Sequence, residues 1–117
     1  MKNKELNDLK DDLAKFASDR DWDKFHSPKN LAMALSGEAG ELADVFQWLT
    51  EEESKSLTDK QRGRAAEEMA DVFMYLLRMS DKLDIDLIEA AHKKLAINAE
   101  KYPVERCYGI AKKYNEL

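Results

Sequence analysis

The sequence contains few of the residues that interrupt helices or cross-link chains. Its 117 residues include four glycines, two prolines and one cysteine, Cys107, which excludes an internal disulfide framework. No apolar run approaches the length of a membrane span, and the first residues lack the apolar core of a signal peptide. The net charge of −5 argues against a nucleic-acid-binding surface, which would need a basic patch. We therefore expect a cytoplasmic protein that has no nucleic-acid or membrane partner.

Apolar residues recur with helical spacing along most of the chain, and no alternating run is long enough for a strand. The predicted helices cover residues 4–20, 28–49, 58–83 and 86–101, and a short polar tail covers 104–117. The predicted fold is all-α, with a protomer resembling a four-helix antiparallel bundle. The length suits a single domain over 1–117, and the hydrophobic fraction of 44% allows only a thin core, which favours a homo-oligomer.

Polar side chains mark the predicted helix starts. Ser27 has the features of an N-cap, and Thr58 with Gln61 three residues later forms a capping-box pattern. The acidic segment 50–58 between the second and third helices predicts a solvated, mobile linker.

Two pairs of carboxylates interrupt the apolar faces of the predicted helices. Glu38 and Glu41 lie on the second helix, and their spacing of three residues puts them on one face. Glu68 and Asp71 have the same spacing on the third helix. Carboxylates at the edge of a core repel one another and lose hydration, so a cation must compensate. Mg²⁺ or Mn²⁺, which take oxygen ligands, are the natural candidates, and the alternative is that both pairs are solvated surface.

A magnesium site of this kind usually binds substrate phosphates as well, so further cations are expected near it. Lys94, Asn98 and Lys101 share one face of the fourth predicted helix, as two cations with an amide donor between them. They are candidates for phosphate binding. The alternative is an ordinary solvated helix face.

Aromatic side chains could form a pocket for the rest of a substrate, because aromatic faces suit stacking of bases. Trp48 and Tyr75 follow the two acidic pairs on the same helix faces, and Trp22 lies beside His26 in the predicted loop 19–28. Core packing is the alternative reading of each aromatic residue.

Several segments resemble the MazG-like members of the all-α nucleoside triphosphate pyrophosphohydrolases, and especially their dCTP pyrophosphatase branch. They are the ExxE pair on one helix, EExxD on the next, RDWDKFHSPKNLAMALSGEAGELADVFQW, EEMADVFMYLL, KLAINAEKYPVE and AKKYNEL. The resemblance covers about residues 19–117.

The resemblance implies a role for each motif. It assigns Mg²⁺ binding to Glu38, Glu41, Glu68 and Asp71, phosphate binding to Lys94, Asn98 and Lys101, and the nucleoside pocket to Trp22, His26, Trp48 and Tyr75. The implied reaction is hydrolysis between the α- and β-phosphates of a nucleoside triphosphate, which yields a monophosphate and pyrophosphate and cleans the nucleotide pool. Water is the nucleophile, and Glu41 or Glu38 orients or deprotonates it. The family also implies a homo-oligomer, a tetramer or a dimer, with sites built between chains.

One position departs from the resemblance. Animal dCTP pyrophosphatases are expected to carry a histidine near the base on the first helix, where this chain has Leu13. An apolar wall discriminates little between bases, so a preference for dCTP, for other deoxynucleotides or for modified bases stays open.

Two alternative functions were weighed. A di-iron bundle would need two Glu-x-x-His motifs, and the chain has one, Glu89 with His92. A non-catalytic helical dimerisation or interaction module would leave the acidic pairs facing solvent.

Overall fold

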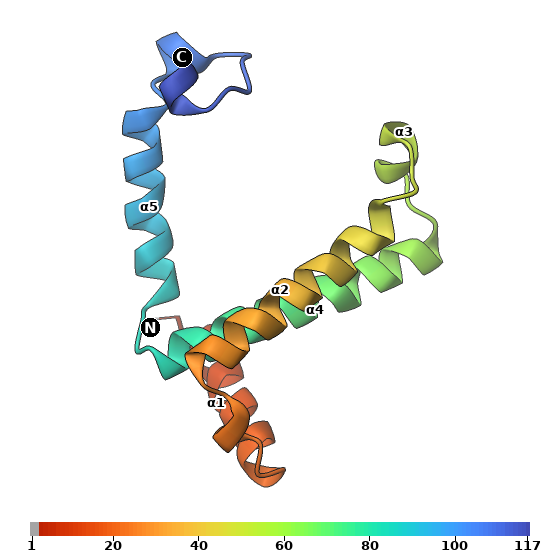
Figure 1. Cartoon of the computed structure of the whole chain (residues 1–117), viewed down its shortest axis with the longest axis vertical. Coiled ribbons are helices and arrows are strands. Elements are labelled where there is room, and N and C mark those ends of the chain that lie inside the picture. Colours follow the sequence, from red (N-terminus) through yellow and green to blue (C-terminus); the bar gives the residue numbers. More distant parts are fainter. Residues whose placement is uncertain (1–2) are drawn as a thin grey trace. The chain divides into compact units, whose positions relative to one another are not determined.

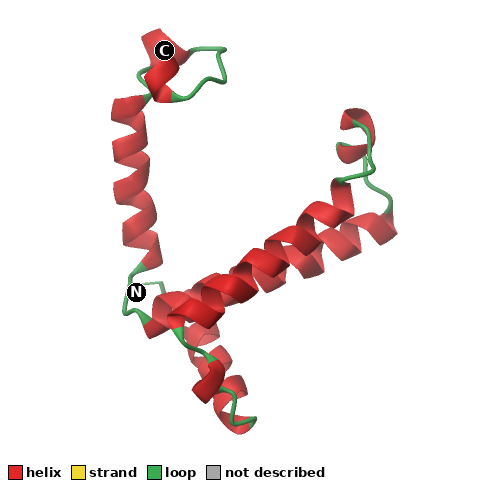
Figure 2. Ribbon diagram, viewed as in Figure 1, coloured by secondary structure: helices red, strands yellow, loops and turns green. Residues whose placement is uncertain are grey.

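The computed structural model describes residues 3–117, and their regular structure is entirely helical. The α-helices are α1 (Lys4–Asp19), α2 (Pro28–Phe46), α3 (Glu51–Ser54), α4 (Asp59–Lys82), α5 (Leu87–Lys101) and α6 (Val104–Cys107), and the 3₁₀ helices are η1 (Asp23–Phe25) and η2 (Tyr114–Glu116). Figure 2 shows helices joined by loops, with no strand in the described part of the chain. The all-α prediction is confirmed.

The described chain divides into two compact units, one ending at Ile85 and one beginning at Asp86. In the first unit, α2 and α4 lie side by side and run in opposite directions (Figure 1). The buried apolar residues of this unit are Ala17 of α1, Leu31 and Val45 of α2, and Ala65 and Leu77 of α4. Because α2 and α4 each bury an apolar residue near both ends, their central segments face each other.

The predicted helix starts agree with the structure. The Ser27 side chain accepts a hydrogen bond from the backbone N–H of Asn30 at 3.1 Å, which satisfies one of the free donors of α2. At α4, Thr58 and Gln61 form both bonds of a capping box, at 3.2 and 2.9 Å. These local contacts begin the two helices that carry the carboxylate pairs.

The acidic segment 50–58, predicted as a solvated, mobile linker, contains a short helix that was not predicted, α3. Glu53 donates its backbone N–H to the Thr50 hydroxyl at 3.1 Å, and its carboxylate accepts the backbone N–H of Thr50 at 2.9 Å. This capping box gives a single helical turn enough local hydrogen bonds to persist in an acidic segment. The helix before it, α2, ends at Phe46, three residues earlier than predicted.

The second unit holds α5 and a folded tail. Residues 104–117 were predicted only as a polar tail, but they form α6 and η2. The ring of Tyr114 stands edge-on to Tyr102, with ring centres 6.1 Å apart, and Lys101 Nζ lies 4.8 Å from the centre of the Tyr114 ring. These ring contacts fold the tail back onto the C-terminal end of α5.

Large apolar side chains stay exposed on both units. Examples are Met33, Trp48, Met69, Leu95, Val104 and Tyr108. None of the described helices combines the length and the apolar character that crossing a membrane requires.

Candidate functional site

Four carboxylates meet where the middle of α2 faces the middle of α4. This acidic cluster consists of Glu38, Glu41, Glu68 and Asp71. One oxygen of each carboxylate lies within 4.8 Å of the chosen oxygen of every other, although the two pairs are far apart in the sequence. Glu41 is exposed and the other three are half-buried. The i, i+3 spacing on each helix and the antiparallel pairing of the helices together bring the four side chains into one group.

Burial and mutual repulsion raise the pKa values of two members of the acidic cluster. Burial is the largest cause at Glu38, and together with the nearby Glu41, Asp71 and Glu68 carboxylates it raises the pKa of Glu38 to about 7. Burial also raises the pKa of Glu68, Glu41 and Asp71 add to this rise, and the positive charge of Arg64 opposes it. The buried Oε2 atoms of Glu38 and Glu68 accept no hydrogen bond from any residue that the structure describes.

This arrangement fits a bound cation. Two buried carboxylate oxygens without partners carry a large desolvation cost, which a positive ion at their centre would offset. The donors are all carboxylate oxygens, the ligand type of hard divalent ions rather than of iron–sulfur or structural zinc sites. The acidic cluster can therefore hold a metal ion.

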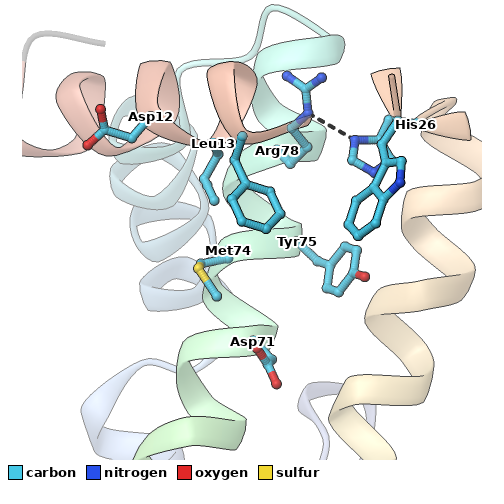
Figure 3. A pocket seen from close by; sticks show the side chains of 9 residues that line it. Asp12, Leu13, His26, Asp71, Met74, Tyr75 and Arg78 are labelled. Atoms are coloured by element: carbon cyan, nitrogen blue, oxygen red, sulfur yellow. Dashed lines mark hydrogen bonds between the residues drawn. The ribbon is translucent and has the colours of Figure 1, made fainter. Parts of the chain in front are cut away.

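A cavity of about 410 Å³ lies beside the acidic cluster and shares Asp71 with it. Its lining side chains are Asp12, Leu13 and Phe16 of α1, Trp22 and His26 around η1, and Asp71, Met74, Tyr75 and Arg78 of α4. Figure 3 shows Asp71, Tyr75 and Arg78 in succession along α4. The cavity is therefore mostly aromatic and aliphatic, with a carboxylate at the end that joins the acidic cluster, a combination typical of small-molecule sites.

Two hydrogen bonds place Trp22 and His26 at this cavity. After the end of α1, Asp21 lies in the left-handed region at φ 56°, and the backbone N–H of Trp22 bonds back to the carbonyl of Ala17 at 2.8 Å. On the other side of η1, the Asn30 amide donates to the backbone carbonyl of Phe25 at 3.0 Å. These hydrogen bonds fix the conformation of the predicted loop 19–28, which contains η1.

Arg78 of α4 forms hydrogen bonds with residues of this loop. Its side chain is 7% exposed, and its Nη2 donates to Asp23 Oδ1 at 2.5 Å. Nη1 donates to Asp81 at 3.3 Å, and Nε donates to Nδ1 of His26 at 3.2 Å. Lys82 donates to the same Asp23 oxygen. We call Arg78, His26, Asp23, Asp81 and Lys82 the Arg78 network.

Burial and nearby charges favour the neutral form of His26. Burial lowers the pKa of His26, and the positive charges of Arg78 and Lys82 lower it further, against a smaller opposite effect of Asp23. The Asp23 pKa is lowered, chiefly by its hydrogen bond with Lys82. The lowered pKa favours a neutral imidazole at the wall of the cavity.

The structure brings some of the predicted nucleoside residues together and leaves one apart. Trp22, His26 and Tyr75 line the cavity, as does Leu13. Trp48 follows the end of α2 and is 87% exposed, and it is not among the cavity residues.

Sequence reasoning missed four other cavity residues. Phe16 follows the apolar spacing of the first helix, and Asp12 and Met74 carry no signal of their own in the sequence. Arg78 follows Tyr75 by three residues on the acidic face of α4, a spacing that could have marked it. The role of Arg78 depends on His26 and Asp23, which lie 52 and 55 positions away in the sequence. No local pattern reveals contacts of this kind.

The predicted phosphate residues lie on α5, in the second unit. Lys94 and Lys101 are exposed and Asn98 is half-buried. Their spacing along α5 places them on one face of this helix. Lys101 is the residue that lies against the Tyr114 ring.

The di-iron alternative finds no support in the described residues. Glu89 forms an ion pair with Lys93 at 2.8 Å, and His92 is exposed. The one group of potential metal ligands in the described part of the chain is the acidic cluster, which contains no histidine.

Comparison with known proteins agrees with this site. The MazG-like family model matches residues 33–117, which include all four members of the acidic cluster. The chain belongs to the MazG-like family. It is 40% identical to dCTP pyrophosphatase 1 of Homo sapiens and 42% identical to that of Bos taurus, in each case over 114 residues, which are 96% of this chain and 67% and 68% of those proteins. A pyrophosphatase from Archaeoglobus fulgidus has a similar structure, with a TM-score of 0.81, 38% identity, and coverage of 88% of this chain and 96% of that one.

Proposed function

We propose that this protein hydrolyses deoxynucleoside triphosphates of the dCTP type, or modified nucleotides, to a nucleoside monophosphate and pyrophosphate with Mg²⁺ at the acidic cluster. The observation that carries the proposal is the meeting of four carboxylates, two of them with buried oxygens that lack hydrogen-bond partners, at one end of a largely apolar cavity. A cluster of this kind binds a cation, and the adjoining cavity suits a base.

The family relationship supports the reaction. Members matched over most of this chain are dCTP pyrophosphatases, and the similar solved structure is a pyrophosphatase. The chain is therefore a nucleoside triphosphate pyrophosphohydrolase. The choice of base, the sugar and the metal belong to the proposal.

The acidic cluster would hold Mg²⁺, or Mn²⁺ in its place, through Glu38, Glu41, Glu68 and Asp71. When bound, such an ion neutralises charge on the phosphates and lowers the barrier to attack by water. Glu41 is the exposed member of the cluster, so it is the best placed to orient or deprotonate the attacking water. Glu38 is the second choice for this role, because it is half-buried and its pKa is raised to about 7.

The nucleoside would occupy the cavity, with the base against Trp22 and Tyr75 and beside His26. Because Asp71 belongs both to the cavity wall and to the acidic cluster, a nucleoside here would have its phosphates next to the metal. Leu13 gives the wall an apolar surface, which suits a range of bases better than strict selection of one.

The remaining parts of the site depend on the assembly. We propose that Lys94, Asn98 and Lys101 bind the phosphates, and that the protein is a homo-oligomer, a tetramer or a dimer. The exposed Trp48, at 87% exposure, would then meet the nucleoside of a second copy.

The test is incubation of the purified protein with each common dNTP and NTP, with and without Mg²⁺, followed by ion-exchange separation of the products. Monophosphate and pyrophosphate that form only with Mg²⁺ would support the proposal and rank the bases. Diphosphate and orthophosphate as products would place the cleavage at the outer bond and contradict it.

A further inference from the structure

His26 lies at the cavity wall, and its two ring nitrogens differ in their hydrogen bonds. Nδ1 accepts the Nε–H of Arg78 at 3.2 Å, as the dashed line in Figure 3 marks. Because an arginine Nε always carries a hydrogen, Nδ1 must be the unprotonated nitrogen. The hydrogen of the neutral imidazole therefore lies on Nε2, across the ring from Arg78.

Arg78 is itself held in place for this contact. Its two terminal nitrogens are bound to Asp23 and Asp81, so the guanidinium cannot turn away from the imidazole without breaking ion pairs. Its side chain is 7% exposed, which protects these bonds from competition with water. Nε2 of His26 forms no hydrogen bond with any residue in the described range 3–117.

We infer that Arg78 is a positioning residue of the nucleoside site: it holds His26 in the Nε2–H tautomer, so that the imidazole offers a hydrogen-bond donor to an acceptor atom on the edge of the base. This inference rests on the proposed function. The ligand chemistry that it selects is a planar base with a carbonyl oxygen or an unprotonated ring nitrogen at that edge. In the other tautomer, Nε2 would be an acceptor and would repel such an atom.

The charged groups near His26 act in opposite directions on its protonation. Burial opposes a second proton on the ring, as do Arg78 and Lys82, and Asp23 favours it less strongly. Asp12 of α1 and Asp71 of α4 are the other charged residues of the cavity wall. The donor on Nε2 is therefore kept without a positive charge on the ring, as recognition of an uncharged base edge requires.

The tautomer is read directly by nitrogen-15 NMR of the imidazole rings. The chain has two histidines, and a His92→Gln variant assigns the remaining signals to His26. We expect wild-type His26 to show a protonated Nε2 and an unprotonated Nδ1. In Arg78→Lys, we expect a mixture of tautomers and protonation at a higher pH, because a lysine ammonium cannot reproduce the planar Nε donor. A wild-type ring with its hydrogen on Nδ1, or an unchanged spectrum in Arg78→Lys, would overturn the inference.

Kinetics with dCTP test the consequence of this arrangement. Arg78→Lys should raise KM about 5-fold with little change in kcat, since it removes one neutral hydrogen bond that ground state and transition state share. In a His26→Gln background, whose amide can supply a similar donor, the same substitution should have no further effect. The matched control is Lys15→Gln, which breaks an exposed ion pair with Asp19 outside the Arg78 network, and its KM should stay at the wild-type value.

The NMR spectrum tests the tautomer of His26, and the kinetics test its consequence for substrate binding, so one result can be negative without the other. The wild-type spectrum needs neither a variant nor a substrate, so it decides the tautomer even if Arg78→Lys does not fold. Absence of hydrolysis with the expected spectrum would contradict the proposed function and leave the tautomer standing. Hydrolysis with a KM that responds equally to Lys15→Gln and Arg78→Lys would show that Arg78 acts only as an ion-pair partner and does not position His26.

Discussion

Two groups of charged residues lie about two turns apart on α4, and the chain treats them in opposite ways. In the Arg78 network, each terminal nitrogen of the arginine has a carboxylate, and Asp23 binds both Arg78 and Lys82. In the acidic cluster, four carboxylates converge and two buried oxygens have no hydrogen-bond partner among the described residues. The first group is complete within one chain, so it can brace the cavity. The second lacks such partners among the described residues, and we propose that a bound cation supplies them, so chemistry is expected there.

The largest expected effect is that of Glu41→Gln, which tests whether the acidic cluster carries the chemistry. The amide keeps the size of the side chain but removes a charge and a base, so we expect dCTP hydrolysis to fall by about 10² to 10⁴-fold while helical content by circular dichroism stays unchanged. Glu67→Gln is the matched control, because Glu67 lies next to Glu68 but outside the acidic cluster and should leave turnover close to wild type. Retained turnover in Glu41→Gln would remove Glu41 from the mechanism.

Metal binding should stabilise the fold through the acidic cluster and not through the Arg78 network. At a Mg²⁺ concentration about 100 times Kd, the expected gain in unfolding free energy is about 2.7 kcal/mol. It should disappear in Asp71→Asn and persist in Lys82→Gln. Thermal unfolding of wild type, Asp71→Asn and Lys82→Gln, each with Mg²⁺ and with a chelator, measures this gain. An equal gain in all three proteins would contradict a site at Asp71.

The same measurement has a pH dependence with a defined sign. The Glu38 pKa is raised from 4.5 to about 7 in the metal-free fold, so its contribution to stability is present below pH 4.5 and is lost as pH rises toward 7. Mg²⁺ binds the ionised carboxylates, so its stabilising effect should be larger at about pH 8 than at about pH 5.5. A larger Mg²⁺ effect at the lower pH would contradict the raised pKa of Glu38.

Loss of Arg78 should destabilise the fold, because its buried guanidinium bonds to Asp23, Asp81 and His26. We expect Arg78→Met to lower the unfolding free energy by about 2 kcal/mol. Lys15→Ala, which removes an exposed ion pair with Asp19, should change it by less than about 0.5 kcal/mol. Urea unfolding at one protein concentration compares them, and equal effects would mean that the Arg78 network is no stronger than surface pairs.

The smallest expected effect concerns α5. Lys94→Ala should weaken binding of a non-hydrolysable triphosphate about 10-fold, as for loss of one charge-assisted hydrogen bond, and that of the monophosphate less. Calorimetric titration with both nucleotides gives the comparison. Equal losses would argue against a contact between Lys94 and the outer phosphates.

Local patterns predicted much of this molecule. Caps such as Ser27 and Thr58 bond to groups three residues away, and the carboxylate pairs follow helical spacing, so both can be read from neighbouring positions. The capping box of Thr50 and Glu53 was equally local, but it was overlooked because the segment is so acidic.

The remainder depends on contacts between distant segments. The distance between the two carboxylate pairs follows from the pairing of α2 with α4, and the cavity needs α1, η1 and α4 together. Arg78 illustrates this limit, since its role becomes visible only when His26 lies beside it. The raised pKa of Glu38 likewise reflects burial between helices, which residue spacing does not determine.

The most direct test of the contrast between the two groups is calorimetric titration of Mn²⁺ into metal-free protein, wild type against a Glu38→Gln, Glu68→Gln double variant. The substituted residues are the two whose buried oxygens lack partners. We predict saturable binding to wild type and none to the folded double variant. Equal Mn²⁺ binding by both proteins would show that the acidic cluster is not the cation site.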